Sequence, residues 1–208
     1  MRETIEERQT KKEDDTGLIG RMLNRTPFIL SCAVLYAGLA SPALTSAKLI
    51  QMGVGVAPSC EIGMNVYKVL VGLTWFGFGL GAIGDFTKSF VKSRRGPDHL
   101  VTGGVFGLFR HPNYTGEVIG WSSSFLASLA AIMCTSTSGA KLQVLKSLAL
   151  PLVLSFSGAL GIIFVLCAAT TNLERRQKEK YGKTEEYKDW VEGSWSGFKL
   201  TPPPPKKE

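Results

Sequence analysis

Residues 145–169 read LKSLALPLVLSFSGALGIIFVLCAA, an apolar segment long enough to cross a lipid bilayer as a helix. A second apolar segment, residues 118–134, precedes it, and the short polar sequence TSTSGAK separates the two. Two apolar helices joined by a polar turn predict a helical hairpin, which returns the chain to the membrane face it left. The hairpin therefore predicts an all-α, polytopic membrane protein.

The charged residues are segregated along the chain, which supports the same fold class. They make up 20% of the 208 residues, and they gather in three stretches: 1–25, 85–110 and 172–208. A soluble protein needs charges on every helix, so long stretches almost bare of charge favour an integral membrane protein. The net charge of +7 belongs to basic residues beside membrane segments, where anionic headgroups account for it, and a nucleic-acid partner is not expected.

The N-terminal half supplies the remaining membrane helices. Residues 62–84 predict one crossing, while residues 26–58, interrupted by Pro42, predict either one tilted helix with an interfacial piece or two short crossings. The bundle then has four to five transmembrane helices. Within 62–84 the glycines recur at intervals of three to five, which either leaves a smooth face for close helix packing or is simply tolerated. These glycines are Gly72, Gly77, Gly81 and Gly84.

These features divide the chain into four regions. They are a charged, disordered tail (1–25), the N-terminal membrane helices (26–84), a region expected to hold the catalytic and cofactor site together with the helical hairpin (85–195), and a Pro-rich disordered end (196–208). The N-terminus lacks an apolar core after a basic start, so it is no signal peptide, and the first membrane segment is expected to target the protein.

Two loops predict the orientation. Residues 85–117 and 172–208 fall on one face of the membrane because the hairpin separates them, and both are net basic. Basic loops remain on the cytosolic side, so this face is expected to be cytosolic. The expected location is the endoplasmic reticulum or another organelle membrane.

The cysteines stand singly in or beside apolar segments, without paired spacing. This pattern predicts buried, reduced thiols, and it indicates neither a zinc site nor a disulfide framework. The four are Cys32, Cys60, Cys134 and Cys167.

The densest polar cluster is RHPNYTGE, residues 110–117, which runs from a basic loop into an apolar segment. It contains His111, one of only two histidines, and its last residue, Glu117, enters a membrane-length segment. An ionisable group at that depth is a functional hypothesis by default. The alternative is a helix-capping loop, with Asn113 or Thr115 as the N-cap and Glu117 favoured by the helix dipole.

Several side chains near the octet suit a charged cofactor. Arg110 is a suitable partner for phosphate or carboxylate, whereas Arg94 and Arg95 fit membrane anchoring better. His111 suits proton transfer or a structural loop, and Glu117 shares a helix face with Trp121, one turn away. No glycine-rich phosphate fingerprint follows a strand, which excludes the soluble dinucleotide-binding folds.

The C-terminal tail carries aromatic residues among many charges, which suggests either an interfacial belt or stacking on a ligand. They are Tyr181, Tyr187, Trp190 and Trp195. With the basic loop and the octet, the tail would enclose a water-soluble cofactor, while the apolar helices admit a lipid-like substrate.

Three motifs resemble one superfamily of membrane enzymes, the steroid reductases and isoprenylcysteine methyltransferases. RHPNYTGEVIGW resembles its signature, and GDFTKSFVKSRRGPDHLVTGGVFGLF resembles the segment before it in the C-terminal domain of steroid 5α-reductases, the DUF1295 type. LERRQKEKYGKTEEYKDW resembles the closing motif, an acid followed by Lys-Tyr-Gly and a later tyrosine. The resemblance covers residues 84 to about 192.

The branch depends on a few positions. Glu117 followed by Trp121 resembles the reductases, as does Glu174 followed by Arg175 in place of a pair of glutamates. The short chain instead favours the small methyltransferases. Reductases of this group also carry a substrate-facing acid and tyrosine in additional N-terminal helices, for which only Tyr36, Glu61 and Tyr67 are candidates here.

The reductase resemblance implies that NADPH delivers hydride to a carbon–carbon double bond of a sterol or other lipid. It assigns catalysis to His111, Tyr114 and Glu117. It implies a larger set of cofactor-binding residues: Arg110, His111, Asn113, Tyr114, Glu117, Glu174 and Tyr187. The methyltransferase resemblance implies S-adenosylmethionine in the same site, and a non-catalytic lipid- or nucleotide-binding subunit is the third possibility. No metal is expected, and the oligomeric state stays open.

Overall fold

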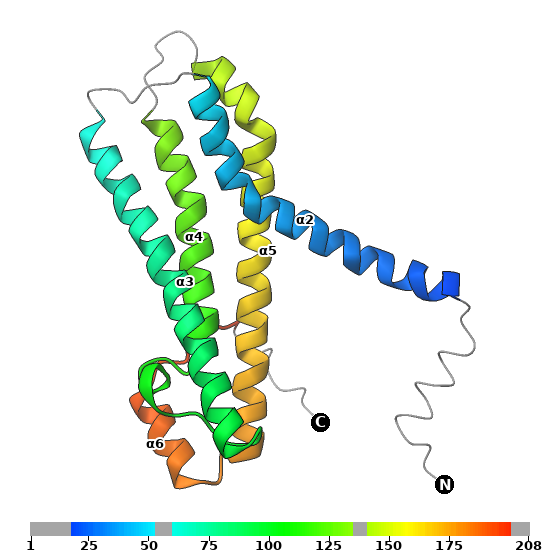
Figure 1. Ribbon diagram of the computed structural model, residues 1–208, viewed down its shortest axis with the longest axis vertical. Coiled ribbons are helices and arrows are strands. Elements are labelled where there is room, and N and C mark those ends of the chain that lie inside the picture. The colour runs from blue at the N-terminus through cyan, green and yellow to red at the C-terminus, as the bar shows by residue number, and fades with distance from the viewer. Residues whose placement is uncertain (1–17, 53–59, 135–140, 201–208) are drawn as a thin grey trace, which may run out of the picture.

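The computed structural model describes residues 18–52, 60–134 and 141–200, and this part of the chain is entirely helical apart from its connections. The described residues form four long helices and a short helix near the C-terminus (Figure 1). They are α2 (Leu18–Gln51), α3 (Glu61–Arg95), α4 (Pro112–Met133), α5 (Lys141–Tyr181) and α6 (Glu185–Gly193). All four long helices are apolar and long enough to cross a membrane. The prediction of an all-α polytopic membrane bundle is confirmed.

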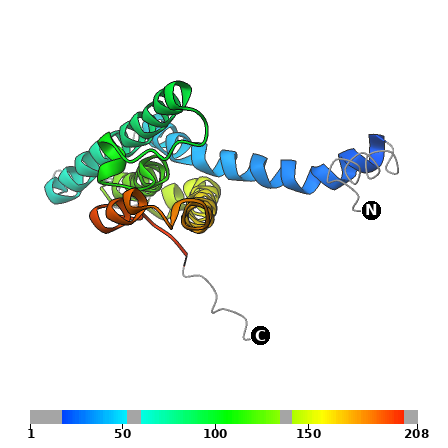
Figure 2. The same cartoon turned by 90° about the horizontal axis from the view of Figure 1, so that it is seen from below.

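The N-terminal region forms one helix, α2, so residues 26–51 do not make two crossings. This helix begins at Leu18, which makes residues 18–25 helical and not part of a disordered tail; residues 1–17 lie outside the described residues. Its second half packs on α5, while its first half leaves the bundle (Figures 1 and 2). Pro42 lies within α2 and removes one helix hydrogen bond, which is a usual cause of such a change in direction.

Helices α3 and α4 pack closely along their length because glycines line the contact. A Cβ atom on Gly77 would lie 2.5 Å from the backbone nitrogen of Gly120, and one on Gly84 would lie 2.9 Å from that of Asn113. Gly81 also faces α4, whereas a Cβ atom on Gly72 would meet nothing within 4 Å, so Gly72 takes no part in the contact. The smooth glycine face is therefore present at three of its four predicted positions.

Helices α3 and α5 continue beyond their apolar segments. The predicted crossing at 62–84 extends to Arg95 and ends at Gly96, whose φ of 95° favours glycine. Helix α5 likewise continues through the charged stretch after residue 169 to Tyr181. At 1.5 Å per residue, 35 residues span roughly 50 Å, more than the roughly 30 Å apolar core of a bilayer. The charged ends therefore project into water beside the membrane.

Residues 104–107 and 185–193 form a small cap over the charged end of the bundle. The 3₁₀ turn η1 (Gly104–Gly107) and α6 pack together through Phe106, Tyr187 and Trp190. The Trp190 Nε1 atom donates a hydrogen bond of 2.6 Å to the Phe106 carbonyl. The loop after α3, the end of α5 and α6 thus share one end of the molecule (Figure 1), as the hairpin predicted.

The prediction of reduced, unpaired cysteines is wrong for two of the four. Cys60 and Cys134 form a disulfide that joins the start of α3 to the end of α4, with a Cα–Cα distance of 5.5 Å. These positions are 74 residues apart in sequence and meet only because the two helices run antiparallel. Cys32 and Cys167 are free thiols. The disulfide lies at the end of the bundle opposite α6 (Figure 1).

Candidate functional site

The octet forms the last loop residues before α4 and the first turns of that helix. The N-cap is His111, and Pro112 takes the first helical position, where its missing N–H does no harm. Neither Asn113 nor Thr115 is the N-cap, and the His111 side chain makes no capping hydrogen bond. The polar side chains of the octet therefore do not serve to cap α4, which disfavours the capping interpretation.

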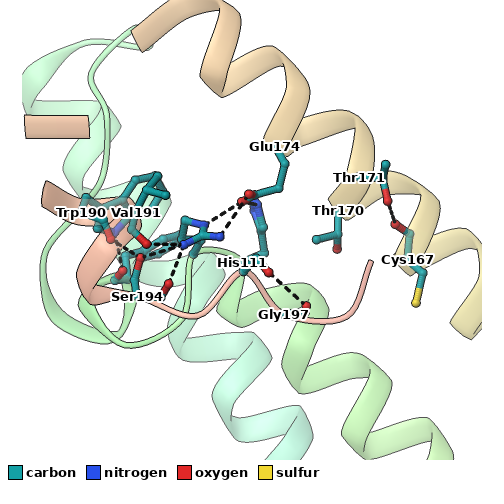
Figure 3. A network of polar contacts seen from close by, with 12 residues as sticks. His111, Cys167, Thr170, Thr171, Glu174, Trp190, Val191, Ser194 and Gly197 are labelled. Atoms are coloured by element: carbon teal, nitrogen blue, oxygen red, sulfur yellow. Dashed lines mark hydrogen bonds and ion pairs between the residues drawn. The ribbon is translucent and has the colours of Figure 1, made fainter. Parts of the chain in front are cut away.

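Glu174 on α5 gathers the first two residues of the octet (Figure 3). Its carboxylate accepts hydrogen bonds of 2.9 and 3.2 Å from Nε and Nη2 of Arg110, a bidentate pair. His111 Nε2 lies 2.8 Å from Glu174 Oε1. Both octet side chains are buried, with 7% and 3% of their surface exposed. This cluster links the loop before α4 to α5.

Arg110 also holds the C-terminal segment. Its Nη1 atom donates hydrogen bonds to the backbone carbonyls of Val191 and Ser194. The Arg110 backbone N–H donates to the Trp195 carbonyl at 2.8 Å, and the Trp195 N–H donates to Leu108 at 2.9 Å. Most guanidinium donors are thus used within the protein, so Arg110 acts first as a brace between α5, α6 and the strand-like residues that follow.

Three side chains of the octet lie near α3: those of Asn113, Tyr114 and Glu117. Asn113 Nδ2 donates a hydrogen bond of 3.1 Å to Asp85 Oδ1. Glu117 lies next to Gly81, whose Cβ position would be 3.9 Å from the Glu117 side chain. The close approach of α3 and α4 thus places Asp85 and the half-buried Tyr114 and Glu117 in one polar cluster near the surface of the bundle.

A cavity of about 380 Å³ lies between the end of α3, the loop after it and the end of α5. Its floor includes the buried Arg110, His111 and Asn113. Its wall and rim are mainly basic. Besides Arg110 and His111, the basic lining residues are Lys88, Lys92, His99, Arg176 and Lys180. We call this space the basic cavity. Its volume is in the range typical of small-molecule sites.

The loop over the basic cavity is pinned at Asp98. The Asp98 carboxylate pairs with Lys180, and Tyr181 Oη donates a hydrogen bond of 2.6 Å to the Asp98 carbonyl. Lys92 Nζ donates one of 2.7 Å to the Pro97 carbonyl. The hydrogen bond and the positive charge of Lys180 hold the pKa of Asp98 below its ordinary value. The loop therefore joins α3 to α5 across the cavity.

One lining atom has no partner in the described part of the chain. Gln177 Oε1 is shielded from solvent and receives no hydrogen bond, although it belongs to a residue that lines the basic cavity. Buried acceptors in folded proteins are nearly always paired. The amide oxygen could accept a hydrogen bond from a bound molecule if the Gln177 side chain turned toward the cavity.

The structure places the predicted site residues in different locations. Arg110, His111 and Asn113 line the basic cavity. Glu174 and Tyr187 lie behind it, on the α6 side of α5, and Tyr187 is buried in the cap core. Burial, together with the nearby Glu174 charge, raises the pKa of the Tyr187 hydroxyl. Tyr187 and Trp190 therefore stabilise the cap instead of forming an open stacking surface.

Other predicted positions lie away from the basic cavity. Arg94 covers the Phe90 ring at 4.1 Å, and Arg95 contacts His99, and neither arginine lines the cavity. Tyr36 is exposed on α2, and Glu61 begins α3 at the disulfide end. Among the described residues, no group of three or more His, Cys, Asp or Glu side chains is arranged to hold a metal ion.

Sequence reasoning missed the α5 side of the cavity. Arg176, Gln177 and Lys180 recur at helical spacing and share one face of α5 with Leu173. That spacing was present in the sequence. The spacing alone did not predict a site, because the sequence does not show that α5 remains helical past its apolar segment or that the 96–101 loop faces it.

A family model described as "Protein of unknown function (DUF1295)" matches residues 50–193. The chain belongs to the DUF1295 family. No curated protein and no solved structure matches the chain. The DUF1295 match includes α3 through α6, so every residue of the basic cavity lies inside it. With its four membrane-length helices, the chain is a membrane protein of the steroid reductase-like family that its motifs resemble.

Proposed function

We propose that this protein is an integral membrane reductase that transfers hydride from NADPH to a carbon–carbon double bond of a sterol or another lipid. The observation that carries the proposal is the basic cavity, with Lys88, Lys92, Arg176 and Lys180 around a buried polar floor. NADPH presents a diphosphate and a further phosphate, the groups that lysine and arginine bind most strongly. S-adenosylmethionine has no phosphate and a net positive charge, so the same residues would repel it.

The floor of the cavity suits the uncharged parts of such a cofactor. Gln177 Oε1 lacks a donor and would accept a hydrogen bond from an amide or hydroxyl group. Asn113 is held by Asp85, and His111 is held by Glu174, so both side chains have fixed orientations. Fixed polar groups lower the entropy lost on binding, which supports a cofactor role for them.

The chemistry requires a hydride and a proton. NADPH would supply the hydride when bound. One new C–H bond forms at each carbon of the double bond, and the π bond between these carbons breaks. We assign the proton to Tyr114, with Glu117 beside it, because both are half-buried and lie in the first turns of α4 next to the cavity-lining Asn113, although neither lines the basic cavity itself. His111 orients the ligand. Glu174 fixes the position of Arg110, and Tyr187 packs in the core that holds α6 in place.

The deciding experiment measures thermal stability of the purified full-length protein in neutral detergent. NADPH should raise the Tm and S-adenosylmethionine should not, because a ligand that binds only the folded state stabilises it. Lys92→Gln should abolish most of that shift. Arg94→Gln is the matched control, because Arg94 lies two residues further along and outside the cavity. Lipid turnover is then followed by mass spectrometry as an NADPH-dependent gain of two hydrogen atoms.

The alternative is a membrane methyltransferase that moves a methyl group from S-adenosylmethionine to a carboxylate or amine at the membrane surface. The motif RHPNYTGEVIGW supports it, because it resembles the signature of both branches of the superfamily. A Tm shift with S-adenosylmethionine alone would select this function. A shift with neither cofactor would favour a non-catalytic subunit.

We infer that the basic end of the bundle faces the cytosol and the disulfide end faces an organelle lumen. Two separate features support this orientation. Basic residues cluster at the cavity end, and the Cys60–Cys134 disulfide lies at the other, as expected where the compartment is oxidising. In sealed, cytosol-out microsomes, protease should remove an epitope tag at the C-terminus. Protection of the tag would overturn the orientation.

A further inference from the structure

A second hollow lies on the other side of α5 from the basic cavity. It has a volume of about 950 Å³ and is bounded by α5, α6 and the last described residues of the chain. Arg175 and Lys178 line it, whereas Arg176 and Gln177 face the basic cavity. We call it the tail groove. Arg110, Glu174 and Tyr187 also line it, but the proposed reductase chemistry places no ligand there.

The tail groove is rich in positive charge. Lys178 of α5 and Lys199 of the C-terminal segment are exposed, and among the described residues no carboxylate lies within ion-pair distance of either. Arg175 and Lys188 add two more cations, and their contacts with acids outside the groove are exposed and therefore weak. Two acids also line the groove: Glu174 is already paired with Arg110, and Glu192 is exposed, so the cations outnumber the acids. The groove thus offers an anion several donors.

The groove begins where the apolar segment of α5 ends, which is the level at which headgroups are expected in a bilayer. The apolar segment of α5 ends near Thr171, and the Leu200 N–H donates a hydrogen bond of 2.9 Å to the Thr171 hydroxyl there. Trp195 and Phe198 on the same C-terminal segment are 48% and 40% exposed. Exposed aromatic side chains of this kind collect at the membrane–water interface.

An apolar stripe continues from the groove along α5 toward the other membrane face. Val153, Leu160 and Phe164 are 62%, 52% and 62% exposed. They precede Thr171 and Lys178 at spacings of four and seven residues, which puts all of them on one helix face. A molecule with a negative head and apolar chains matches both parts of this face.

We propose that the tail groove binds an anionic phospholipid. Lys178 and Lys199 hold the phosphate, and the acyl chains lie along the stripe from Phe164 to Val153. Basic pockets at the cytosolic ends of membrane helices recognise such headgroups by charge. This site lies on the other side of α5 from the basic cavity, although Arg110 lines both. Its existence does not depend on the identity of the cofactor.

The test uses the full-length protein in neutral detergent, titrated with phosphatidylserine or phosphatidylcholine while Tm is measured. Phosphatidylserine should raise the Tm more than phosphatidylcholine. Lys178→Gln and Lys199→Gln should each weaken the apparent affinity for phosphatidylserine about fivefold. Lys183→Gln is the matched control, because Lys183 is exposed on the same end of the molecule but does not line the groove.

Three results would overturn the proposal. The first is an equal loss of affinity in Lys183→Gln, which would mean general attraction between a basic surface and an anionic lipid. The second is an equal Tm shift with inorganic phosphate, which would assign the groove to a soluble anion. The third is equal binding of both lipids. Because both lysines are exposed, the variants should fold, and an unchanged NADPH response in Lys178→Gln would show that the two sites are distinct.

Discussion

Glu174 shows how the octet is stabilised at the level of single residues. Its carboxylate pairs with Arg110 and His111, and all three side chains are largely removed from water. Burying a charged group away from water is unfavourable unless the group is paired and hydrogen-bonded. Arg110 meets this condition by donating to Glu174 and to two backbone carbonyls. The cluster therefore sets the position of His111 beside the basic cavity.

Replacing Glu174 should destabilise the protein more than replacing a nearby exposed acid. Glu174→Gln leaves the buried Arg110 charge without its counter-ion, so we expect a loss of about 3 kcal/mol in the free energy of unfolding. Glu179→Gln is the control, since its pair with Arg175 is exposed and contributes at most about 1 kcal/mol. Thermal unfolding in detergent measures both. Equal Tm values for the two variants would contradict this account of Arg110.

Replacing Glu117 distinguishes a catalytic role from a role at the start of α4. If it only favours the start of α4, Glu117→Ala should lower stability by about 0.5–1 kcal/mol and leave activity intact. We expect instead a folded protein whose turnover falls by about a hundredfold or more, as for loss of a group that assists proton transfer. Activity per folded protein is the measurement. Full activity in Glu117→Ala would remove this residue from the proposed site.

At the scale of helices, the site depends on how closely α3 approaches α4. Asn113 reaches Asp85 only because Gly81 and Gly84 keep the two backbones near each other. In a bilayer the apolar surfaces of helices gain little by leaving lipid, so small residues and tight packing drive such contacts. The glycine face thus connects membrane packing to the geometry of the octet.

Two glycines on α3 test this contact. Gly77→Ala brings a methyl group to 2.5 Å from the Gly120 backbone, so the helices must separate, with a loss of about 1–3 kcal/mol. Gly79→Ala meets nothing within 4 Å and should be neutral or slightly stabilising, because alanine favours helix. Thermal unfolding of the two variants provides the comparison. Similar effects at both positions would argue against a tight α3–α4 contact.

The Asp98–Lys180 pair should make the stability of the cavity loop depend on pH. Since the folded-state pKa of Asp98 is lowered, the folded protein releases this proton more readily than the unfolded chain. The pair therefore contributes stability above the ordinary pKa of 3.8, and this contribution is lost as pH falls through the folded value. Asp98→Asn should lower the Tm at neutral pH only. A Tm difference that does not shrink as the pH is lowered below 3.8 would point to another cause.

At the scale of the whole molecule, the two ends of the bundle differ in chemistry. One end carries the cap, the basic cavity and the tail groove, and the other carries the disulfide. The disulfide joins the same two helices that hold the octet and Asp85 at the far end. It therefore restrains the α3–α4 pair across the full thickness of the membrane.

Breaking this bond should lower stability without touching the cavity. Cys60→Ser is expected to reduce the free energy of unfolding by about 2–4 kcal/mol, because the bond restricts the unfolded chain. Cys32→Ser, which removes a free thiol, is the control. Alkylation before non-reducing electrophoresis, followed by thermal unfolding, measures both the bond and its effect. A fully reduced Cys60 in protein from cells would contradict the proposed lumenal orientation.

Local composition and segment length are enough to predict the fold class and the position of the octet along the chain. Membrane crossing depends on local length and polarity, which are readable from one segment such as 145–169. The tertiary structure decided what is close in space. The Cys60–Cys134 bond, the Arg110–Glu174 pair and the α5 wall of the basic cavity each join distant positions. Such contacts follow from antiparallel packing and from helices that outlast their apolar segments, and no local pattern encodes either.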